Sequence, residues 1–185
     1  MLGNGLSLAD RHEESLSVRE AELSMDRRVG APEESILATQ GNLAVTYHEL
    51  GRSEQALRLK RDVYSGTLKL YGKEHKDTLT EAYNYACSLL KVGRFEEARS
   101  VLRENILVGR RVLGEGDDLT LSMRANYALA LHVDDSATID DLREAVTTLE
   151  DTERTARRVL GGQHPTTDRM EQSLRRARAV LAARE

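Results

Sequence analysis

The spacing of three asparagines is the feature that most constrains the fold of this 185-residue chain. Asn42, Asn84 and Asn126 stand 42 positions apart in matching phrases, Asn-Leu-Ala followed twice by Asn-Tyr-Ala. A fixed period of this length is typical of repeat proteins, in which similar units stack and each contacts its neighbours. We therefore expect a stack of like units rather than one large globular core.

Each unit is predicted to be a helix hairpin. Residues 37–78 and 79–120 share ten identical positions at this spacing, including glycine, asparagine and small alanine. Apolar helix-like runs end at Gly51 and Gly72, where glycine can adopt the left-handed conformation that closes a helix. The order is thus a first helix, a tight turn, a longer second helix and a loop.

These stops also predict the domain organisation. After a frayed entry segment at 1–10, residues 11–185 form a single helical domain. The expected ranges are a lone second helix at 11–29, repeats at about 33–72, 75–114 and 117–161, and a capping helix at about 166–184. The third repeat has an expanded turn, and the capping helix has arginine-rich outer positions, as a terminal helix requires. The fold class is therefore all-α: a helix-hairpin solenoid of about three repeats plus a half repeat.

Composition narrows the functional classes. With no Trp, one Phe and six Tyr, the chain suits a thin core of alanine, leucine and valine between helices. A single cysteine rules out an internal disulfide and fits a reducing compartment. The net charge of −4, with both signs interleaved, lacks a basic footprint for nucleic acid. Without a long apolar run or a secretory signal, we expect a cytoplasmic protein that binds neither nucleic acid nor membrane.

The repeat resembles the tetratricopeptide repeat, in the 42-residue form found in kinesin light chains. The motif reads Asn-Leu-Ala-x-x-Tyr-x-x-Leu-Gly-Arg-x-x-x-Ala from Asn42 to Ala56, and Gly-x-x-His loops occur at Gly72–His75 and Gly161–His164. The resemblance covers about 30–184 and implies a right-handed superhelix that acts as a protein-binding scaffold or adaptor. No sustained heptads are present, so the chain resembles the cargo-reading part of such proteins without their motor-binding coiled coil.

In this family the first helix of each hairpin lines a concave groove, and the resemblance implies which residues face it. An asparagine amide both donates and accepts hydrogen bonds, so it can pair with a peptide backbone whatever its side chains. We expect the groove to bind an extended peptide or partner segment; the alternative is that the asparagines only hold repeat geometry. The implied groove residues are Asn42, Val45, His48, Tyr83, Asn84, Cys87, Leu90, Asn126, Leu129, His132, Arg169 and Arg176.

One mode of ligand binding in the family is not expected here. Some tetratricopeptide domains clamp a C-terminal carboxylate with lysine and arginine beside the groove asparagines. The corresponding positions hold Ala38, Ser122 and Asn126, which carry no charge. Arg169 and Arg176 instead either attract an acidic residue near the end of the groove or form the solvated face of a capping helix.

Other interpretations of function stay open. One is a repeat segment of a larger signalling or sensor protein that serves intramolecular regulation or self-association through the N-terminal half repeat. Another is a thiol–imidazole pair between Cys87 and His48 or His132 of neighbouring units, although a small apolar filler is the simpler role for Cys87. The chain shows no metal-ligand spacing, phosphate-binding loop or catalytic set, so we predict no enzymatic activity, no cofactor and no metal.

Overall fold

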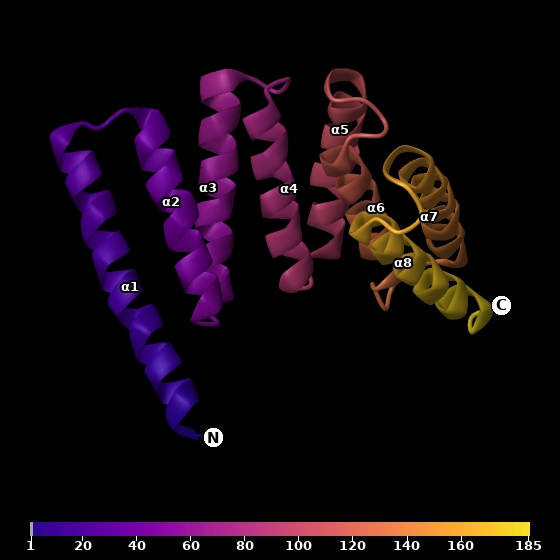
Figure 1. Cartoon of the computed structure of the whole chain (residues 1–185), viewed down its shortest axis with the longest axis horizontal. Helices are drawn as coiled ribbons and strands as arrows, with labels where there is room; N and C mark the ends of the chain where they lie inside the picture. Colours follow the sequence, from indigo (N-terminus) through magenta and orange to yellow (C-terminus); the bar gives the residue numbers. More distant parts are fainter. Residues whose placement is uncertain (1) are drawn as a thin grey trace. The chain divides into compact units, whose positions relative to one another are not determined.

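The structure is a computed structural model that describes the backbone of residues 2–185 and the side chains of residues 12–185. The predicted entry segment, residues 1–10, lies outside the residues whose side chains are described. Within the described residues there are eight helices and no strand, which confirms the all-α fold class (Figure 1). The helices are α1 (Leu2–Val29), α2 (Glu33–Glu49), α3 (Ser53–Tyr71), α4 (Lys76–Lys91), α5 (Phe95–Val112), α6 (Asp118–His132), α7 (Ile139–Leu160) and α8 (Pro165–Ala182).

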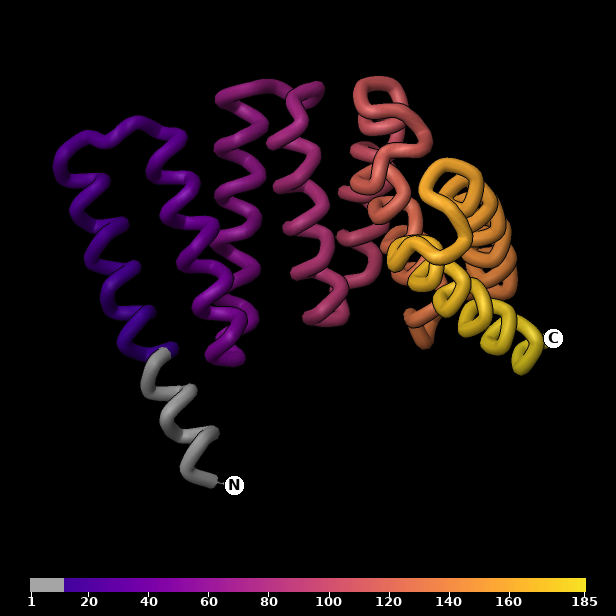
Figure 2. The backbone as a smooth tube through the Cα atoms, viewed as in Figure 1, coloured from indigo at the N-terminus to yellow at the C-terminus, as the bar shows by residue number. Residues whose placement is uncertain are grey.

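The helices belong to two compact units, residues 1–72 with α1–α3 and residues 73–185 with α4–α8. Within the units, α2 packs on α3, α4 on α5, and α6 on α7. The backbone trace shows each of these pairs as two neighbouring helices joined by a short connection (Figure 2). The helix hairpin is therefore the building element, whereas the assignment of repeats and of a single domain stays a prediction. Helix α1 begins before residue 11, where the sequence predicts its start.

The predicted glycine stops are confirmed. Gly51 has φ 72° and follows the end of α2, and Gly72 has φ 82° at the end of α3. A side chain at these φ values would clash with the backbone, so glycine is the residue that lets the chain turn here. The Gly72 N–H donates to the Leu68 carbonyl, so the stop also satisfies a carbonyl at the helix end.

The loops between hairpins end in a side-chain cap. His75 and His164 accept through Nδ1 from the backbone N–H of Asp77 and Thr166, at 3.3 and 3.2 Å. Asp117 accepts from Leu119 N–H at 2.9 Å in the same way. The first backbone N–H groups of a helix have no partner in the helix itself, so these caps fix where α4, α6 and α8 begin.

The core is thin and rich in leucine and alanine, as the scarcity of aromatic residues predicts. In the first unit Leu16 and Leu23 of α1 pack with Leu43 of α2. In the second unit a larger cluster joins all five helices through fully buried side chains. These are Leu79, Ala86, Leu102, Leu121, Met123, Ala128, Leu131, Ala145, Leu149, Ala156, Met170 and Ala177.

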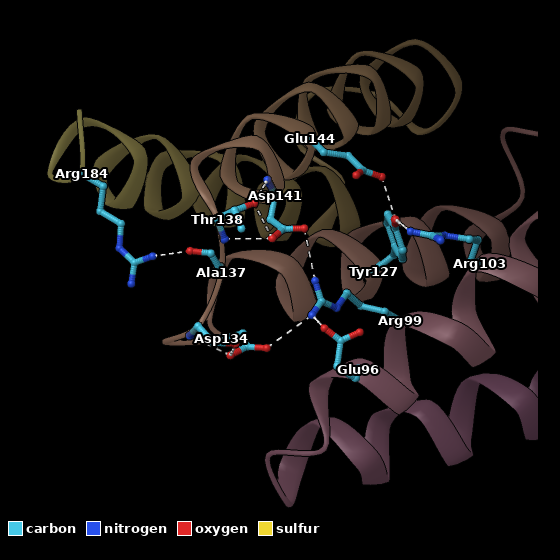
Figure 3. A network of polar contacts seen from close by, with 11 residues as sticks. Glu96, Arg99, Arg103, Tyr127, Asp134, Ala137, Thr138, Asp141, Glu144 and Arg184 are labelled. Atoms are coloured by element: carbon cyan, nitrogen blue, oxygen red, sulfur yellow. Dashed lines mark hydrogen bonds and ion pairs between the residues drawn. The ribbon is translucent and has the colours of Figure 1, made fainter.

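The expanded turn between α6 and α7 is held by a buried arginine (Figure 3). The Arg99 side chain of α5 is only 10% exposed, and its guanidinium donates to Asp134 at 3.4 Å and Asp141 at 3.3 Å. It also pairs with Glu96 on its own helix. Thr138 and Asp141 form a capping box at the start of α7, with reciprocal bonds between side chain and backbone. The turn is therefore fixed from both α5 and α7.

Hydrogen bonds keep both aspartates of this turn ionised. Thr138 lowers the pKa of Asp141, with a further contribution from the Arg99 charge, and Ser136 does the same for the pKa of Asp134. A carboxylate whose pKa is lower in the folded than in the unfolded chain stabilises the fold above its unfolded pKa, near 4. That contribution is lost as the pH falls through the folded pKa.

We expect Asp141→Asn to lower the free energy of unfolding at neutral pH, with the difference from the parent chain shrinking as the pH is lowered from about 5 to 2. Urea unfolding followed by circular dichroism over this range measures the difference. Asp140→Asn is the matched control, because Asp140 is the preceding residue and its side chain is 93% exposed. A difference for Asp141→Asn that does not vary with pH would contradict the assignment.

Candidate functional site

The first helices of the hairpins in the second unit lie against one another. Helix α6 packs on both α4 and α8, and buried alanines such as Ala86 and Ala128 stand in their shared core. Small residues at a helix contact let two helix axes come close. Side chains at the edge of these contacts are therefore within hydrogen-bonding reach of the next helix.

Five side chains at these contacts form a connected set, here called the α4–α6–α8 polar cluster: Tyr83, Cys87, Ser122, Asn126 and Arg169. The Asn126 amide donates from Nδ2 to the Cys87 sulfur at 3.1 Å, which links α6 to α4. Arg169 donates to the Ser122 hydroxyl at 3.2 Å, which links α8 to α6. Tyr83 is hydrogen-bonded to both Cys87 and Ser122. Four of the predicted groove residues thus come together at one place.

Burial sets the protonation of this cluster. It raises the pKa of the Cys87 thiol, with hydrogen bonds from Tyr83 and Asn126 acting in the opposite direction. Burial likewise raises the pKa of the Tyr83 hydroxyl, and the Arg169 charge lowers it slightly. Both groups are therefore neutral near pH 7, and the cluster offers hydrogen-bond donors and acceptors rather than a thiolate nucleophile.

The alternative thiol–imidazole pair is not formed between Cys87 and His132 in the second unit. The His132 ring is 6% exposed, and its Nδ1 lies 2.7 Å from the carbonyl oxygen of Ala128 on the same helix. Burial lowers the pKa of His132, so the ring is neutral. Cys87 bonds instead to Tyr83 and Asn126, and little of His132 is accessible to a ligand.

The two asparagines of the second unit differ in their contacts. The Asn126 amide bonds to Cys87 on the neighbouring helix, as expected of an asparagine that holds the repeat geometry. Asn84, half-buried on α4, makes no side-chain hydrogen bond within the described residues. Its amide is therefore available to a ligand without breaking a contact within the protein.

The other predicted groove residues of the second unit are distributed around the cluster. Leu90 and Leu129 are half-buried and present apolar surface on α4 and α6. Arg176 is exposed on α8, as is Arg169. Arg169 is thus the arginine of α8 that the structure ties to the cluster.

In the first unit, three predicted residues lie exposed on α2: Asn42, Val45 and His48. Val45 is 47% exposed, a high value for an apolar side chain. Asn42 borders an open hollow of about 570 Å³ formed with α1 residues such as Glu14 and Arg19. These three residues are described within their own unit only, and their role in a groove stays a prediction.

One member of the cluster, Ser122, is not among the candidate groove residues named from the sequence. The structure shows it bonded to Tyr83 and Arg169, so it connects two predicted residues. The helical stripe does place it on the groove face, four residues and about one turn before Asn126. Because it lacks the cation of a carboxylate clamp, no further feature of the sequence selects it.

The fold and the repeated hairpin define this chain as a helix-hairpin repeat protein. The tetratricopeptide repeat family matches residues 36–77 and 82–118. These residues resemble tetratricopeptide repeats, and the chain has the fold of kinesin-light-chain-like repeat proteins.

Solved structures show the same fold at low sequence identity. Two crystal structures of a kinesin-light-chain-like protein with nearly identical TPR-like repeats, from Podosopora anserina, are 23% identical to this chain. Each covers 96% of this chain, which in turn covers 85% of each, with TM-scores of 0.80 and 0.78. BtubC (BKLC) from P. vanneervenii is 16% identical, with coverages of 95% and 75% and a TM-score of 0.69. No curated protein matches the chain in sequence.

The described residues form neither a membrane-spanning helix nor a cluster of metal ligands. No helix there combines the length and the apolar character needed to cross a membrane. No group of three or more histidine, cysteine, aspartate or glutamate side chains in the described part of the chain is placed to hold a metal ion. The α4–α6–α8 polar cluster, defined by its bonds between helices, is the candidate site.

We expect Cys87 to react slowly with iodoacetamide at neutral pH, because burial raises the pKa of its thiol. The rate measured against pH should have its midpoint above that of N-acetylcysteine under the same conditions. Cys87→Ser, which removes the chain's single cysteine, gives the background. A midpoint below that of N-acetylcysteine would show an activated thiolate and contradict the description of the cluster as neutral.

Proposed function

We propose that the face formed by α4, α6 and α8 binds an extended segment of a partner protein. Tetratricopeptide repeats generally mediate protein–protein interaction, and proteins built from them are typically non-catalytic scaffolds. The observation that carries the proposal is Asn84, whose half-buried amide has no side-chain hydrogen bond within the described residues. Because this amide has no bond within the protein to break, a peptide group can pair with it and gain the net free energy of a hydrogen bond.

The spacing of the helices suits a peptide backbone. Packed helices lie about 8–10 Å apart, and an extended chain advances about 3.3 Å per residue. One asparagine per first helix would therefore meet an extended peptide roughly every third residue. The Asn84 amide would bond to the N–H and C=O groups of one peptide residue. The Asn126 oxygen would accept from a peptide N–H further along, because only the Nδ2 atom of Asn126 bonds to Cys87.

Side chains around the asparagines set which segment fits. Tyr83, Leu90 and Leu129 provide half-buried apolar surface for alternate side chains of the peptide. Arg169 and Arg176 are exposed on α8 at one end of this face and favour an acidic residue there. The proposed ligand is an extended segment with apolar residues followed by an acidic one.

We expect Asn84→Ala to weaken binding of such a segment about tenfold, because the loss of one to two hydrogen bonds is worth about 1–2 kcal/mol. The ligand is a peptide selected from a random 12-residue library on the parent chain, and its Kd is measured by fluorescence anisotropy. The melting temperature should not change, since the amide has no partner in the protein to lose.

Gln163→Ala is the matched control, because it removes an amide from an exposed loop outside this face. The same peptide should bind this variant as it binds the parent chain. If Asn84→Ala lowers the melting temperature while the affinity per folded molecule stays unchanged, the asparagine only holds repeat geometry and the proposal fails. Equal loss of affinity in both variants would place the peptide elsewhere.

A second candidate function is self-association through α1, and a stripe of exposed apolar side chains favours it. Val18, Met25 and Val29 are 67%, 48% and 65% exposed. Spacings of seven and four residues place them on one face of the helix, while Leu16 and Leu23 are buried with α2. A second copy of the chain, presenting the same stripe, would cover this apolar face in a symmetric contact.

We expect the double substitution Val18→Gln and Met25→Gln to shift the chain towards monomer in size-exclusion chromatography with light scattering. Removing apolar area from the contact weakens association without touching the buried face of α1. Ser17→Gln with Ser24→Gln is the matched control, because both serines are exposed and also stand seven residues apart. A parent chain that is monomeric at all concentrations tested would exclude self-association.

A further inference from the structure

Helix α6 carries a second set of polar side chains on the side away from the α4–α6–α8 polar cluster. Ser122 and Asn126 bond to α8 and α4, whereas Arg124 and Tyr127 border a pocket between α5 and α7. The pocket has a volume of about 340 Å³. Its charged and aromatic lining residues are Arg103 and Arg110 of α5, Arg124 and Tyr127 of α6, and Glu144 and Asp151 of α7.

Two of the three arginines in this pocket already have partners. Arg103 donates to the Tyr127 hydroxyl at 2.8 Å, with its guanidinium carbon 5.6 Å from the centre of the ring. Tyr127 donates in turn to Glu144 at 2.7 Å, as Figure 3 shows. Arg110 donates from Nε to Glu115 at 3.0 Å. These contacts build the walls of the pocket and leave their guanidinium groups partly occupied.

Arg124 is different. It is half-buried, and within the described part of the chain its guanidinium makes no hydrogen bond or ion pair. Burial lowers its pKa, as does the neighbouring Arg110 charge, whereas the charges of Glu115 and Asp151 act in the opposite direction. A guanidinium remains protonated in proteins, so the pocket holds a half-buried positive charge without a direct counter-charge. Such a charge is unfavourable unless an anion or ordered water meets it.

The charges around the pocket favour an anion with a single charge. The lining holds three guanidinium groups and two carboxylates, and Glu115 pairs with Arg110 from beside the pocket. Positive and negative groups are therefore equal in number, and Arg124 is the guanidinium without a direct carboxylate partner among the described residues. The two carboxylates of the lining, Glu144 and Asp151, would repel a phosphate dianion more strongly than a carboxylate. A carboxylate also matches the planar fork of a guanidinium, which can donate two parallel hydrogen bonds to it.

Apolar surface beside Arg124 indicates what accompanies the carboxylate. Leu107 is 65% exposed, and Ile106 next to it is half-buried. A segment with a leucine or isoleucine next to its acidic residue would cover this surface while its carboxylate meets Arg124. A free carboxylate alone would leave the apolar wall in water.

We propose that this pocket is a second protein-binding site, in which Arg124 pairs with an aspartate or glutamate of an apolar–acidic partner segment. The site is separate from the α4–α6–α8 face and does not depend on Asn84. One chain would then hold two segments on opposite sides of α6.

The test uses the full chain and three capped peptides: acetyl-Gly-Leu-Glu-Leu-Gly-amide and its glutamine and phosphoserine counterparts. Binding is followed by NMR through the Arg124 Nε–H resonance and the Leu107 methyl groups. We expect the glutamate peptide to shift both signals saturably at millimolar concentration. The glutamine peptide should bind about tenfold more weakly or less, since hydrogen bonds to a charged group are the stronger kind.

Substitutions separate binding from folding. Arg124→Gln should weaken the glutamate peptide about tenfold, as read from the Leu107 methyl groups, and Arg124→Lys should weaken it less because the charge stays while the fork is lost. Arg175→Gln on α8 is the matched control, since it removes an exposed guanidinium outside the pocket and should leave binding unchanged. The melting temperature of Arg124→Gln should not fall, because Arg124 has no described partner to lose.

Several results would overturn the proposal. They are the lack of a saturable shift with the glutamate peptide, equal binding of the glutamate and glutamine peptides, or unchanged binding by Arg124→Gln. Tighter binding of the phosphoserine peptide would assign the pocket to phosphate instead. Asn84→Ala should leave this peptide unaffected; a loss there would show one site rather than two, whereas failure of the groove proposal alone leaves this pocket standing.

Discussion

Close contact between helices through buried alanine is the constraint on which the rest of the second unit depends. Ala86 of α4 and Ala128 of α6 are fully buried, as is Ala177 of α8. With no side chain beyond Cβ, these residues let neighbouring helices approach until their polar edges meet. The bond from Asn126 to Cys87 and the bond from Arg169 to Ser122 both cross such contacts. A bulky residue at these positions would separate the helices and with them the side chains of the candidate site.

Helix α6 packs against α4, α5, α7 and α8, so its side chains face neighbours of different chemistry. Ser122 and Asn126 turn towards α8 and α4, where Arg169 is the one charged member of the polar cluster. Arg124 and Tyr127 turn towards α5 and α7, where charged groups gather. Positions two residues apart lie roughly on opposite sides of a helix, so one short stretch contributes to both surfaces. A single helix between two pairs of neighbours can therefore present two chemically distinct sites.

The features that follow from local backbone chemistry were the ones that the sequence could predict. The 42-residue spacing predicted the hairpins, and Gly51 and Gly72 predicted the helix ends, because a turn at positive φ requires glycine. The groove stripe brought Tyr83, Cys87, Asn126 and Arg169 into one cluster because helical periodicity places such residues on one face. These predictions depend on a few neighbouring residues and on a period, both of which can be read from a chain.

The features that depend on contacts between distant segments could not be predicted in this way. The expanded turn interrupts the repeat at Asp134, so no spacing indicated that Arg99 would lie between Asp134 and Asp141. Nor did periodicity distinguish His132, which the fold buries, from an exposed groove residue. Whether an amide or a guanidinium is hydrogen-bonded depends on which side chains the neighbouring helices place next to it.

Arg99 and Arg124 show how the presence or absence of a carboxylate partner determines what an arginine does. Both are arginines of the second unit, of which Arg99 is buried and Arg124 is half-buried. Arg99 meets Glu96, Asp134 and Asp141, so its charge is compensated and it holds a turn in place. Arg124 meets no carboxylate directly among the described residues, and its charge remains uncompensated beside an open pocket. The same side chain thus stabilises the fold where the fold supplies the anion, and is poised for recognition where a partner must supply it.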